Sequence, residues 1–323
     1  MSLATRFDFT LNDYEAMLGM RILIDYDKCI MRIDQEMQAR KMLAAFGMDN
    51  MNLTTVSSPM PSDPPPTEED VPKEPAELAR CRALFDLRAA IGHLNFLVGG
   101  TRPGDSITVK ILSKFMNGWG MAHIRYCKHL MRWVATTVSM PLILRGGYDM
   151  GVQVFTDASH ASDVDSRRSL LGIVIKICGN TCLWVVFYSS MVAHSSCESE
   201  ILSLDKGATL AMLVKYMIEV MGRPVQGPIT IFVDNQAAID IGSNPVQASR
   251  NLHMHARYFY VRDLVRMGVV KILHLASKDQ LADILVTFKG SPCYNQLLRY
   301  LMGCAIVVAD GEGKYRWDTS LLL

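Results

Sequence analysis

Four acidic residues stand where a metal-dependent nuclease would need them. Asp157 lies in the strand-like run VQVFTDAS, and Asp234 ends a second apolar run, ITIFVDNQ. Glu200 lies near the start of a long helical stretch, and Asp283 belongs to the helical segment DQLADIL. Carboxylates at the ends of buried strands are costly unless they are paired or bind a cation. Mg²⁺ takes oxygen ligands and leaves positions for water and substrate phosphates. The four acids therefore predict phosphodiester hydrolysis with two Mg²⁺ or Mn²⁺ ions.

Each of these acids also has a purely structural interpretation. Asp157 alone could end a strand and start a turn. Asp234 precedes a helix and could cap it, although Asn235 can supply that cap and free Asp234. Asp283 alone fits a surface acid beside an apolar stripe, with Asp279 as the capping residue. Taken singly, the acids leave both interpretations open.

Glu198 and Glu200 lie within one helical turn and have to be distinguished. Ser195 and Glu198 have the form of a capping box, in which Ser195 is the N-cap and Glu198 reaches back. Glu200 instead shares its helical face with small and apolar residues at steps of four, three and four: Leu204, Gly207 and Ala211. Such a face can approach a sheet closely. We therefore expect Glu200 to be the acid of the site.

The elements that must position these acids form an α/β pattern between residues 149 and 290. Three strand candidates, 152–158, 170–178 and 182–190, follow one another through short turns and are therefore antiparallel. After them come a helix from Cys197, a strand at 229–233, two helices, a strand at 269–276 and a helix from Gln280. This order predicts a five-stranded mixed sheet flanked by helices. Cys178 and Cys182 flank a hairpin turn rather than a zinc site.

The preceding part of the chain has a different character. Seven of the thirteen prolines fall between Pro59 and Pro75, among acids and serines. This composition predicts an extended linker over residues 57–80. Residues 1–56 contain two short strand candidates and an amphipathic helix. Three helix candidates follow the prolines, at 76–98, 107–119 and 123–138. Gly146-Gly147 is a plausible hinge, and residues 291–323 form a C-terminal tail.

Composition restricts the function classes. Half of the 323 residues are apolar and a fifth are charged, as in globular proteins. The net charge of +1 gives no bulk attraction for nucleic acid, so phosphate contacts need local clusters. The arginines best placed to bind phosphates are Arg167, Arg168 and Arg250. Arg257 and Arg262 are further members of such a cluster. Eight scattered cysteines without a secretory signal favour reduced thiols. With no membrane-length apolar run, we expect an intracellular protein, cytoplasmic or nuclear, without a membrane partner.

The acids lie within motifs that resemble a known family. The ordered segments are TDAS, SRRSLLG, VAHSSCESEI, VDNQAAI, SRNLHMHARYFYVRDLV and DQLADIL. Together they resemble the ribonuclease H domain of copia-type LTR retrotransposon polyproteins, over roughly residues 157–288. Upstream, SSPM, IGHLNFLVGGTRPG and ILSKFM resemble the segment that closes the reverse transcriptase of the same polyproteins. Single motifs are weak, but the ordered set favours the metal site over four unrelated caps.

The resemblance implies a fold, an activity and a partner. It implies a ribonuclease H-like domain at 149–290, a reverse transcriptase remnant at 1–56 and a thumb- or connection-like helical region at 81–148. It also implies that Asp157, Glu200, Asp234 and Asp283 bind metal and catalyse hydrolysis of the RNA strand in RNA–DNA hybrids. Other parts of a retrotransposon polyprotein are expected partners.

Departures from the family pattern keep a second interpretation open. The chain lacks the paired Y-V-D-D-type acids of a polymerase palm, so we expect no polymerase activity. The segment SSMVAHSS is shorter than in the family, His255 replaces a usual Asp, and Val286-Thr287 replace Thr-Lys. A decayed or repurposed scaffold with this fold and without catalysis is therefore the alternative. An integrase or transposase is disfavoured, because Glu200 lies on the first helix of the domain.

Overall fold

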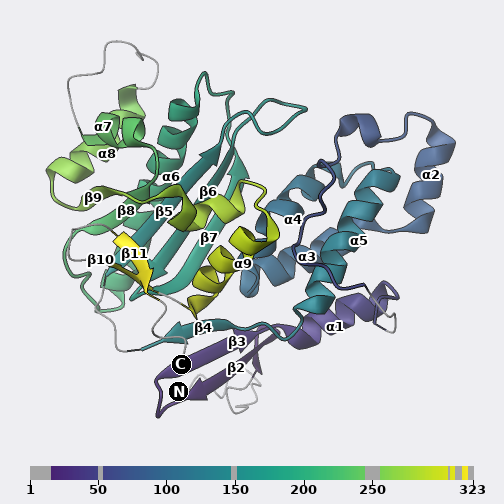
Figure 1. The fold of residues 1–323 in the computed structure, drawn as a ribbon, viewed down its shortest axis with the longest axis horizontal. Helices are drawn as coiled ribbons and strands as arrows, with labels where there is room; N and C mark the ends of the chain where they lie inside the picture. The colour runs from purple at the N-terminus through teal and green to yellow at the C-terminus, as the bar shows by residue number, and fades with distance from the viewer. Residues whose placement is uncertain are drawn as a thin grey trace, which may run out of the picture.

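The largest sheet of the described structure is a five-stranded mixed sheet (Figure 1). The computed structural model describes residues 16–49, 54–146, 151–243, 255–304, 306–309 and 315–318. The strands are β5 (Val152–Ser159), β6 (Leu170–Ile177), β7 (Asn180–Tyr188), β8 (Ile229–Val233) and β9 (Val270–His274). Their order is β7-β6-β5-β8-β9. The first three strands pair antiparallel, while β8 is parallel to β5 and β9 is parallel to β8. The predicted fold class is confirmed.

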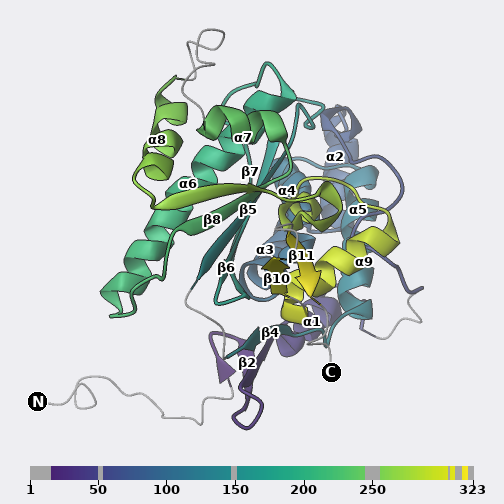
Figure 2. The same ribbon diagram turned by 60° about the vertical axis from the view of Figure 1, so that its left-hand side comes forward.

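The sheet is buried on both faces because apolar side chains alternate along its strands. Val154 and Ile231 face helices α6 (Ser196–Val220), α7 (Gln236–Ser243) and α8 (His255–Arg266), which cover one side (Figure 2). Phe155 and Phe232 face the opposite way and stack with ring centroids 5.0 Å apart. Neighbouring positions of β5 and β8 thus contribute to two separate apolar cores, as expected for strands between two layers.

The region before the sheet forms four α-helices whose apolar residues join the core on this second face: α2 (Pro75–Leu84), α3 (Leu87–Gly100), α4 (Ser106–Leu112) and α5 (Met121–Thr136). The sequence predicted three helices, with residues 76–98 as a single one. The chain instead leaves helical geometry at Phe85 and starts a new helix two residues later, at Leu87. The Asp86 carboxylate accepts a hydrogen bond from the backbone N–H of Ala89 at 2.9 Å, which caps α3. A local side-chain cap therefore divides the predicted helix.

The N-terminal strands are joined by a strand from far along the chain. Strands β1 (Ala16–Met17), β2 (Met20–Asp25), β3 (Ile30–Asp34) and β4 (Leu142–Arg145) form one antiparallel sheet, with α1 (Glu36–Ala45) after β3. The hairpin and α1 agree with the sequence prediction. Strand β4 does not, because 81–148 was predicted to be helical. Four residues are too few to give a periodic signal, and it is pairing with β3 that makes them a strand. Gly147 of the predicted hinge lies outside the described residues.

The proline-rich segment is not a free linker. Pro59, Met60 and Pro66 are buried, and the His129 ring on α5 shares a hydrogen bond with the Ser58 carbonyl at 3.0 Å. Helix α2 begins at Pro75, inside the predicted linker, since proline suits the first helical position. A few apolar side chains among the prolines are enough to attach the extended chain to α5. We call residues 54–74 the proline strap.

The C-terminal segment completes the second core. The 3₁₀ turn η8 (Leu281–Leu285) leads to α9 (Ser291–Arg299), the π turn η9 (Tyr300–Cys304) and a hairpin of β10 (Ile306–Ala309) and β11 (Tyr315–Asp318). One apolar cluster extends from α1 through α3, α4 and α5 to the sheet and α9. This shared core joins regions that the predicted domain boundaries separate. Among the described residues, no helix has both the length and the apolar character needed to cross a bilayer.

Candidate metal and nucleic-acid site

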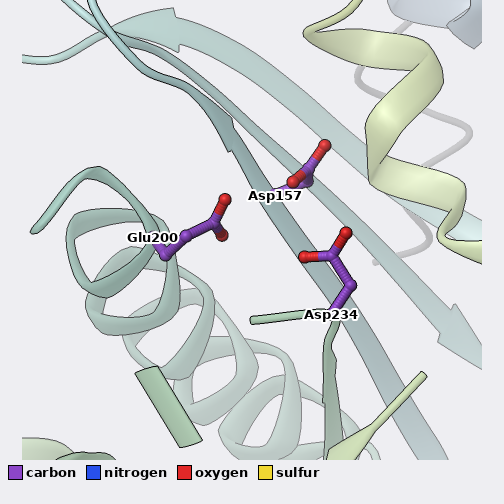
Figure 3. A group of neighbouring side chains, drawn as sticks. All are labelled: Asp157, Glu200 and Asp234. Atoms are coloured by element: carbon purple, nitrogen blue, oxygen red, sulfur yellow. The ribbon is translucent and has the colours of Figure 1, made fainter. Parts of the chain in front are cut away.

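Three of the four predicted acids meet at one edge of the sheet. Asp157 on β5, Glu200 on α6 and Asp234 directly after β8 each place a carboxylate oxygen within 4.8 Å of the others. Figure 3 shows the three side chains directed toward one another from three separate elements. The carboxyl ends of β5 and β8 lie side by side because the strands are parallel neighbours. The topology thus assembles a potential set of oxygen ligands for a hard divalent cation.

A buried glutamine fixes the spacing of the two strands below this cluster. The parallel pairing of β5 with β8 ends at Phe155 and Phe232. Beyond that point, the side-chain amide of Gln280 donates to the backbone carbonyls of Thr156 and Phe232, at 3.2 Å each. Gln280 is fully buried. It thereby links the residue before Asp157 to the residue two positions before Asp234. The sequence did not indicate this role of Gln280.

Helix α6 lies close enough to β5 to bring Glu200 into the cluster. A side chain at Gly207 would collide with the methyl group of Thr156, so the glycine permits the close approach. The Ser203 hydroxyl donates to the backbone carbonyl of Asp157 at 2.9 Å. Leu204 is buried on the same helical face. The helical face predicted for Glu200 is therefore the face that contacts the sheet.

Two predicted helix caps, next to the acid cluster in the chain, are present in the structure and do not use its acids. The Ser195 side chain accepts a hydrogen bond from the Glu198 N–H at 3.1 Å, as expected for the N-cap of α6. The Glu198 carboxylate accepts from the N–H of His194 at 2.7 Å, one residue before the expected donor. Asn235 accepts from the Ala238 N–H at 3.1 Å and so supplies the cap of α7. The Asp234 carboxylate does not have to perform that role.

The cluster concentrates negative charge in a shielded place. Burial raises the pKa of Asp157, and the neighbouring Asp283 and Asp234 raise it further. Burial also raises the pKa of Glu200, followed by the effects of Asp157 and Asp234. Within the described structure, the Oε2 atom of Glu200 is buried without a hydrogen-bond partner. A proton or a cation would relieve this repulsion, and raised carboxyl pKa values of this origin are typical of functional sites.

The fourth predicted acid lies near the cluster but outside it. Asp283 is buried in η8 and forms an ion pair with Lys289. Its charge still contributes to the raised pKa of Asp157, so the surface interpretation of Asp283 is wrong. The expected cap at Asp279 is also wrong, because Gln280 accepts from the Ala282 N–H at 3.3 Å and caps η8. Lys289 gave no signal in the sequence, since an isolated lysine beyond a helix has no distinguishing pattern.

The predicted phosphate-binding arginines are only partly placed. Arg167 and Arg168 are exposed in the loop between β5 and β6, which starts three residues after Asp157. Arg250 lies outside the described residues, as does the side chain of Arg257. Arg262 is 7% exposed and so is not the surface residue that was expected.

Comparison with known proteins identifies the relatives of the chain. No family model matches it. The Pol polyprotein from transposon TNT 1-94 of Nicotiana tabacum is 26% identical over 284 residues, which are 88% of this chain and 21% of the polyprotein. The polyprotein from transposon RE1 of Arabidopsis thaliana is 28% identical over 200 residues, 62% of this chain and 14% of the polyprotein. The chain's homologues are Pol polyproteins of copia-type transposons. It spans about a fifth or less of their length.

Solved structures of ribonuclease H domains are also similar in part. LC11-RNase H1 in complex with an RNA/DNA hybrid matches 42% of this chain and 93% of that chain, with 16% identity and a TM-score of 0.32. The N-terminal RNase H domain of rv2228c from Mycobacterium tuberculosis matches 47% of this chain and 98% of that chain, with 12% identity and a TM-score of 0.32. The ribonuclease H-like domain is recognised from its mixed sheet, the order of its elements and the polyprotein homologues.

Proposed function

We propose that the ribonuclease H-like domain is a metal-dependent endonuclease that hydrolyses the RNA strand of RNA–DNA hybrids. The observation that supports this most strongly is the meeting of Asp157, Glu200 and Asp234 from three elements, with ligand oxygens within 4.8 Å. The homologous Pol polyproteins favour a role in copying a transposon. As part of such a polyprotein, the domain would act beside other segments of the same product.

The residues of the cluster fit a divalent cation. All three offer carboxylate oxygens, the ligands that Mg²⁺ and Mn²⁺ accept. Two of the three are buried, and the Glu200 Oε2 atom lacks a hydrogen-bond partner in the described structure. A purely structural cluster of acids would be expected to use its buried oxygens in hydrogen bonds. The arrangement therefore has both the charge and the free ligand atom that a cation requires.

Each acid has a proposed role in the reaction. Asp157, Glu200 and Asp234 would hold the cations, and Asp283, whose carboxylate pairs with Lys289, would complete the set. Two bound Mg²⁺ or Mn²⁺ ions supply an activated water and charge stabilisation for the leaving 3′ oxygen. Gln280 keeps the strands of Asp157 and Asp234 at a fixed separation. Recognition would depend on the 2′-hydroxyl and the groove shape of the hybrid rather than on base sequence.

A cleavage assay tests the proposal. The purified chain is incubated with an RNA–DNA hybrid labelled on the RNA strand, with Mg²⁺ or Mn²⁺ and in parallel with EDTA. We expect cleavage with either metal, none with EDTA, and none for Asp157→Asn, which removes a negative ligand at almost unchanged size. The matched control is Asp240→Asn, because Asp240 is exposed on α7 and outside the cluster.

Three outcomes would contradict the proposal. Cleavage that persists in EDTA, or in Asp157→Asn, would exclude the acid cluster as the site. Equal cleavage of single-stranded DNA would exclude the hybrid as the preferred substrate. A folded parent chain that cuts no nucleic acid with either metal would favour the noncatalytic scaffold instead.

A further inference from the structure

The loop that follows Asp157 has a closed shape of its own. Residues 160–168, here called the arginine loop, connect β5 to β6 and carry the exposed Arg167 and Arg168. The N–H of Asp163 donates to the Arg168 carbonyl at 3.1 Å, and the N–H of Arg167 donates to the Asp163 carbonyl at 2.8 Å. Arg167 has φ of 57°, in the left-handed region. The position of Asp163 therefore determines the positions of Arg167 and Arg168.

The two ends of the arginine loop are attached next to the acid cluster. The His160 Nδ1 atom and the Ser199 hydroxyl are 2.9 Å apart and share a hydrogen bond. The Ser169 hydroxyl, directly after the loop, donates to the same Ser199 oxygen at 3.2 Å. Ser199 immediately precedes Glu200. The ends of the loop are thus fixed to the helix that holds one of the acids.

The middle of the arginine loop is attached to the helical region by Lys114. This residue lies in the 3₁₀ turn η4 (Ser113–Phe115) after α4, and its ammonium group pairs with Asp163 and, at 2.6 Å, with Asp165. The side chains of Lys114, Asp163 and Asp165 are 21%, 7% and 11% exposed. Burial lowers the pKa of Lys114, but its hydrogen bonds to the two carboxylates outweigh that effect and raise it. These ion pairs are shielded and charge-assisted, so they are stronger than an exposed pair.

Apolar packing contributes little beside these ion pairs. A cavity of about 310 Å³ separates Ser162 and Val164 of the loop from Ile107 and Ile111 of α4. Among the described residues, the Glu68 N–H of the proline strap also donates to Asp165, at 3.1 Å. Because the contact is hollow, polar bonds rather than packed side chains fix the loop against the helical region.

We infer that Lys114 is a positioning residue for nucleic-acid binding, which makes the helical region a working part of the hybrid-binding site. The inference rests on the proposed function. Through Asp163 and Asp165, Lys114 holds the arginine loop where Arg167 and Arg168 meet the phosphates of a hybrid that enters the acid cluster. Loss of Lys114 would loosen the loop and leave two shielded carboxylates without their counter-charge. Both effects oppose the binding of a polyanion.

Hybrid binding by a cleavage-deficient protein tests this role. Fluorescence anisotropy with a labelled hybrid compares the full chain carrying Asp157→Asn with the same chain also carrying Lys114→Met. We expect Lys114→Met to raise Kd about tenfold, equivalent to about 1.4 kcal/mol of binding free energy, because Arg167 and Arg168 lose their fixed position. In the cleaving parent, Lys114→Met should raise KM by a similar factor and change kcat less than about twofold, because the acids are untouched. Lys114→Arg, which keeps the charge, should restore most of the binding.

A lysine one turn earlier provides the control for charge alone. Lys110 lies on α4 with its ammonium 6.0 Å from the Tyr188 ring centre, and it forms no ion pair with another described residue. Lys110→Met should leave Kd within about twofold, since this lysine does not hold the arginine loop and a single charge is largely screened at physiological salt. If Lys114→Met binds hybrid as tightly as Lys110→Met, the inference is wrong.

Hydrogen exchange separates this inference from the proposed function. Lys114→Met should speed exchange of the Asp163 and Arg167 amides, whose bonds close the loop, and Lys110→Met should not. If exchange accelerates but no variant binds hybrid, the proposed function fails while the attachment of the loop stands. If hybrid binds and neither exchange nor Kd responds to Lys114→Met, the positioning role fails while the proposed function stands.

Discussion

Two regions of this molecule bury charged side chains in opposite ways. In the helical region, the guanidinium of Arg102 pairs with Asp105 at 2.6 Å, and both residues are 3% exposed. The other Asp105 oxygen accepts from the Trp133 indole at 2.8 Å, and Arg102 also donates to the Thr137 carbonyl at 3.0 Å. At the edge of the sheet, Asp157 and its neighbouring acids face one another instead. The depth of burial is similar, but the balance of charge is not.

The difference separates a structural use of buried charge from a functional one. The arginine and aspartate of the helical region neutralise each other, and their remaining polar atoms have hydrogen bonds. Such a set fixes local structure, and it becomes costly only when one partner is removed. The acids of the sheet edge carry excess negative charge and a buried oxygen of Glu200 without a partner in the described structure. Such a set lowers stability until a cation or proton joins it.

The largest effect is expected from breaking the neutral pair. Arg102→Met leaves Asp105 buried without its counter-charge, and we expect a loss of about 3–5 kcal/mol in the free energy of unfolding. Urea denaturation measures the loss. Arg40→Met is the control, because its pair with Glu36 is exposed and contributes less than about 1 kcal/mol. Equal losses for the two variants would mean that the buried pair is not a structural centre of the helical region.

Substitution of an acid of the cluster should raise the stability of the metal-free protein, whereas substitution of Arg102 lowers stability. Glu200→Gln removes a ligand, and we expect hybrid cleavage to fall at least about a hundredfold, equivalent to about 2.7 kcal/mol of activation free energy. In the absence of metal, the same variant should melt at a higher temperature than the parent, because one of three repelling acids is gone. A lower melting temperature with unchanged cleavage would assign Glu200 to the same structural class as Asp105.

Gln280, which lies below the acid cluster, is expected to contribute both to stability and to cleavage. Gln280→Leu leaves the Thr156 and Phe232 carbonyls without their shared donor, and we expect a loss of about 1–3 kcal/mol. Cleavage should fall as well, because Asp157 and Asp234 lose their fixed spacing. The control is Gln236→Leu, since Gln236 is exposed on α7 and bonds only within its helix, to Asp240, among the described contacts. If Gln280→Leu is as stable and active as Gln236→Leu, the bridge between the strands has no role.

The sequence specified those parts of the site that depend on local chemistry. Ser195 and Asn235 could be recognised as caps because an N-cap needs a short polar side chain next to its own helix. The face of Glu200 followed from helical periodicity over twelve residues, from Glu200 to Ala211. The five strands followed from apolar runs bounded by turn residues, including the hairpin at Cys178 and Gly179, both of which have positive φ. Each of these signals lies within one element, so no knowledge of the fold was needed.

The parts that the sequence did not reveal depend on contacts between distant segments. Gln280 bonds to Thr156 across 124 positions and Lys114 to Asp163 across 49, and neither residue type has a distinguishing local pattern. Strand β4 exists because β3 lies beside it. The proline strap has the composition of a linker, yet Met60 reaches the helical core. Composition predicts what a segment can do alone, and these segments take their structure from neighbours.

The excess negative charge at the sheet edge also predicts how stability depends on pH. As the pH rises, the metal-free protein should become less stable, while stabilisation by Mg²⁺ should increase. Burial, then Asp283 and Asp234, raise the pKa of Asp157 to about 7. The folded protein therefore keeps a proton that the unfolded chain releases near pH 4. The stability of the metal-free protein should fall as the pH rises from about 4 to about 7, by at most about 1.4 kcal/mol per pH unit for this proton.

Bound metal should replace that proton. The rise in melting temperature caused by Mg²⁺ is therefore expected to be larger at pH 8 than at pH 5, because protons compete with the cation for the same oxygens. Differential scanning fluorimetry at the two pH values measures it. The Asp157→Asn variant should show a smaller dependence on both pH and Mg²⁺. A Mg²⁺ shift that is equal at the two pH values would remove the link between the raised pKa and metal binding.

The smallest effect is expected at the acid two residues from Glu200. The Glu198 carboxylate accepts from the His194 N–H, and its own N–H donates to Ser195, so this acid serves the start of α6. In Glu198→Gln the side-chain carbonyl can still accept that bond, and we expect stability to change by less than about 0.5 kcal/mol and cleavage to change little. Mg²⁺ should stabilise Glu198→Gln as much as the parent and Glu200→Gln much less, which thermal melts with and without Mg²⁺ would show. If Glu198→Gln is the variant that loses Mg²⁺ stabilisation, the assignment of one acid to the helix cap and the other to the metal site is reversed.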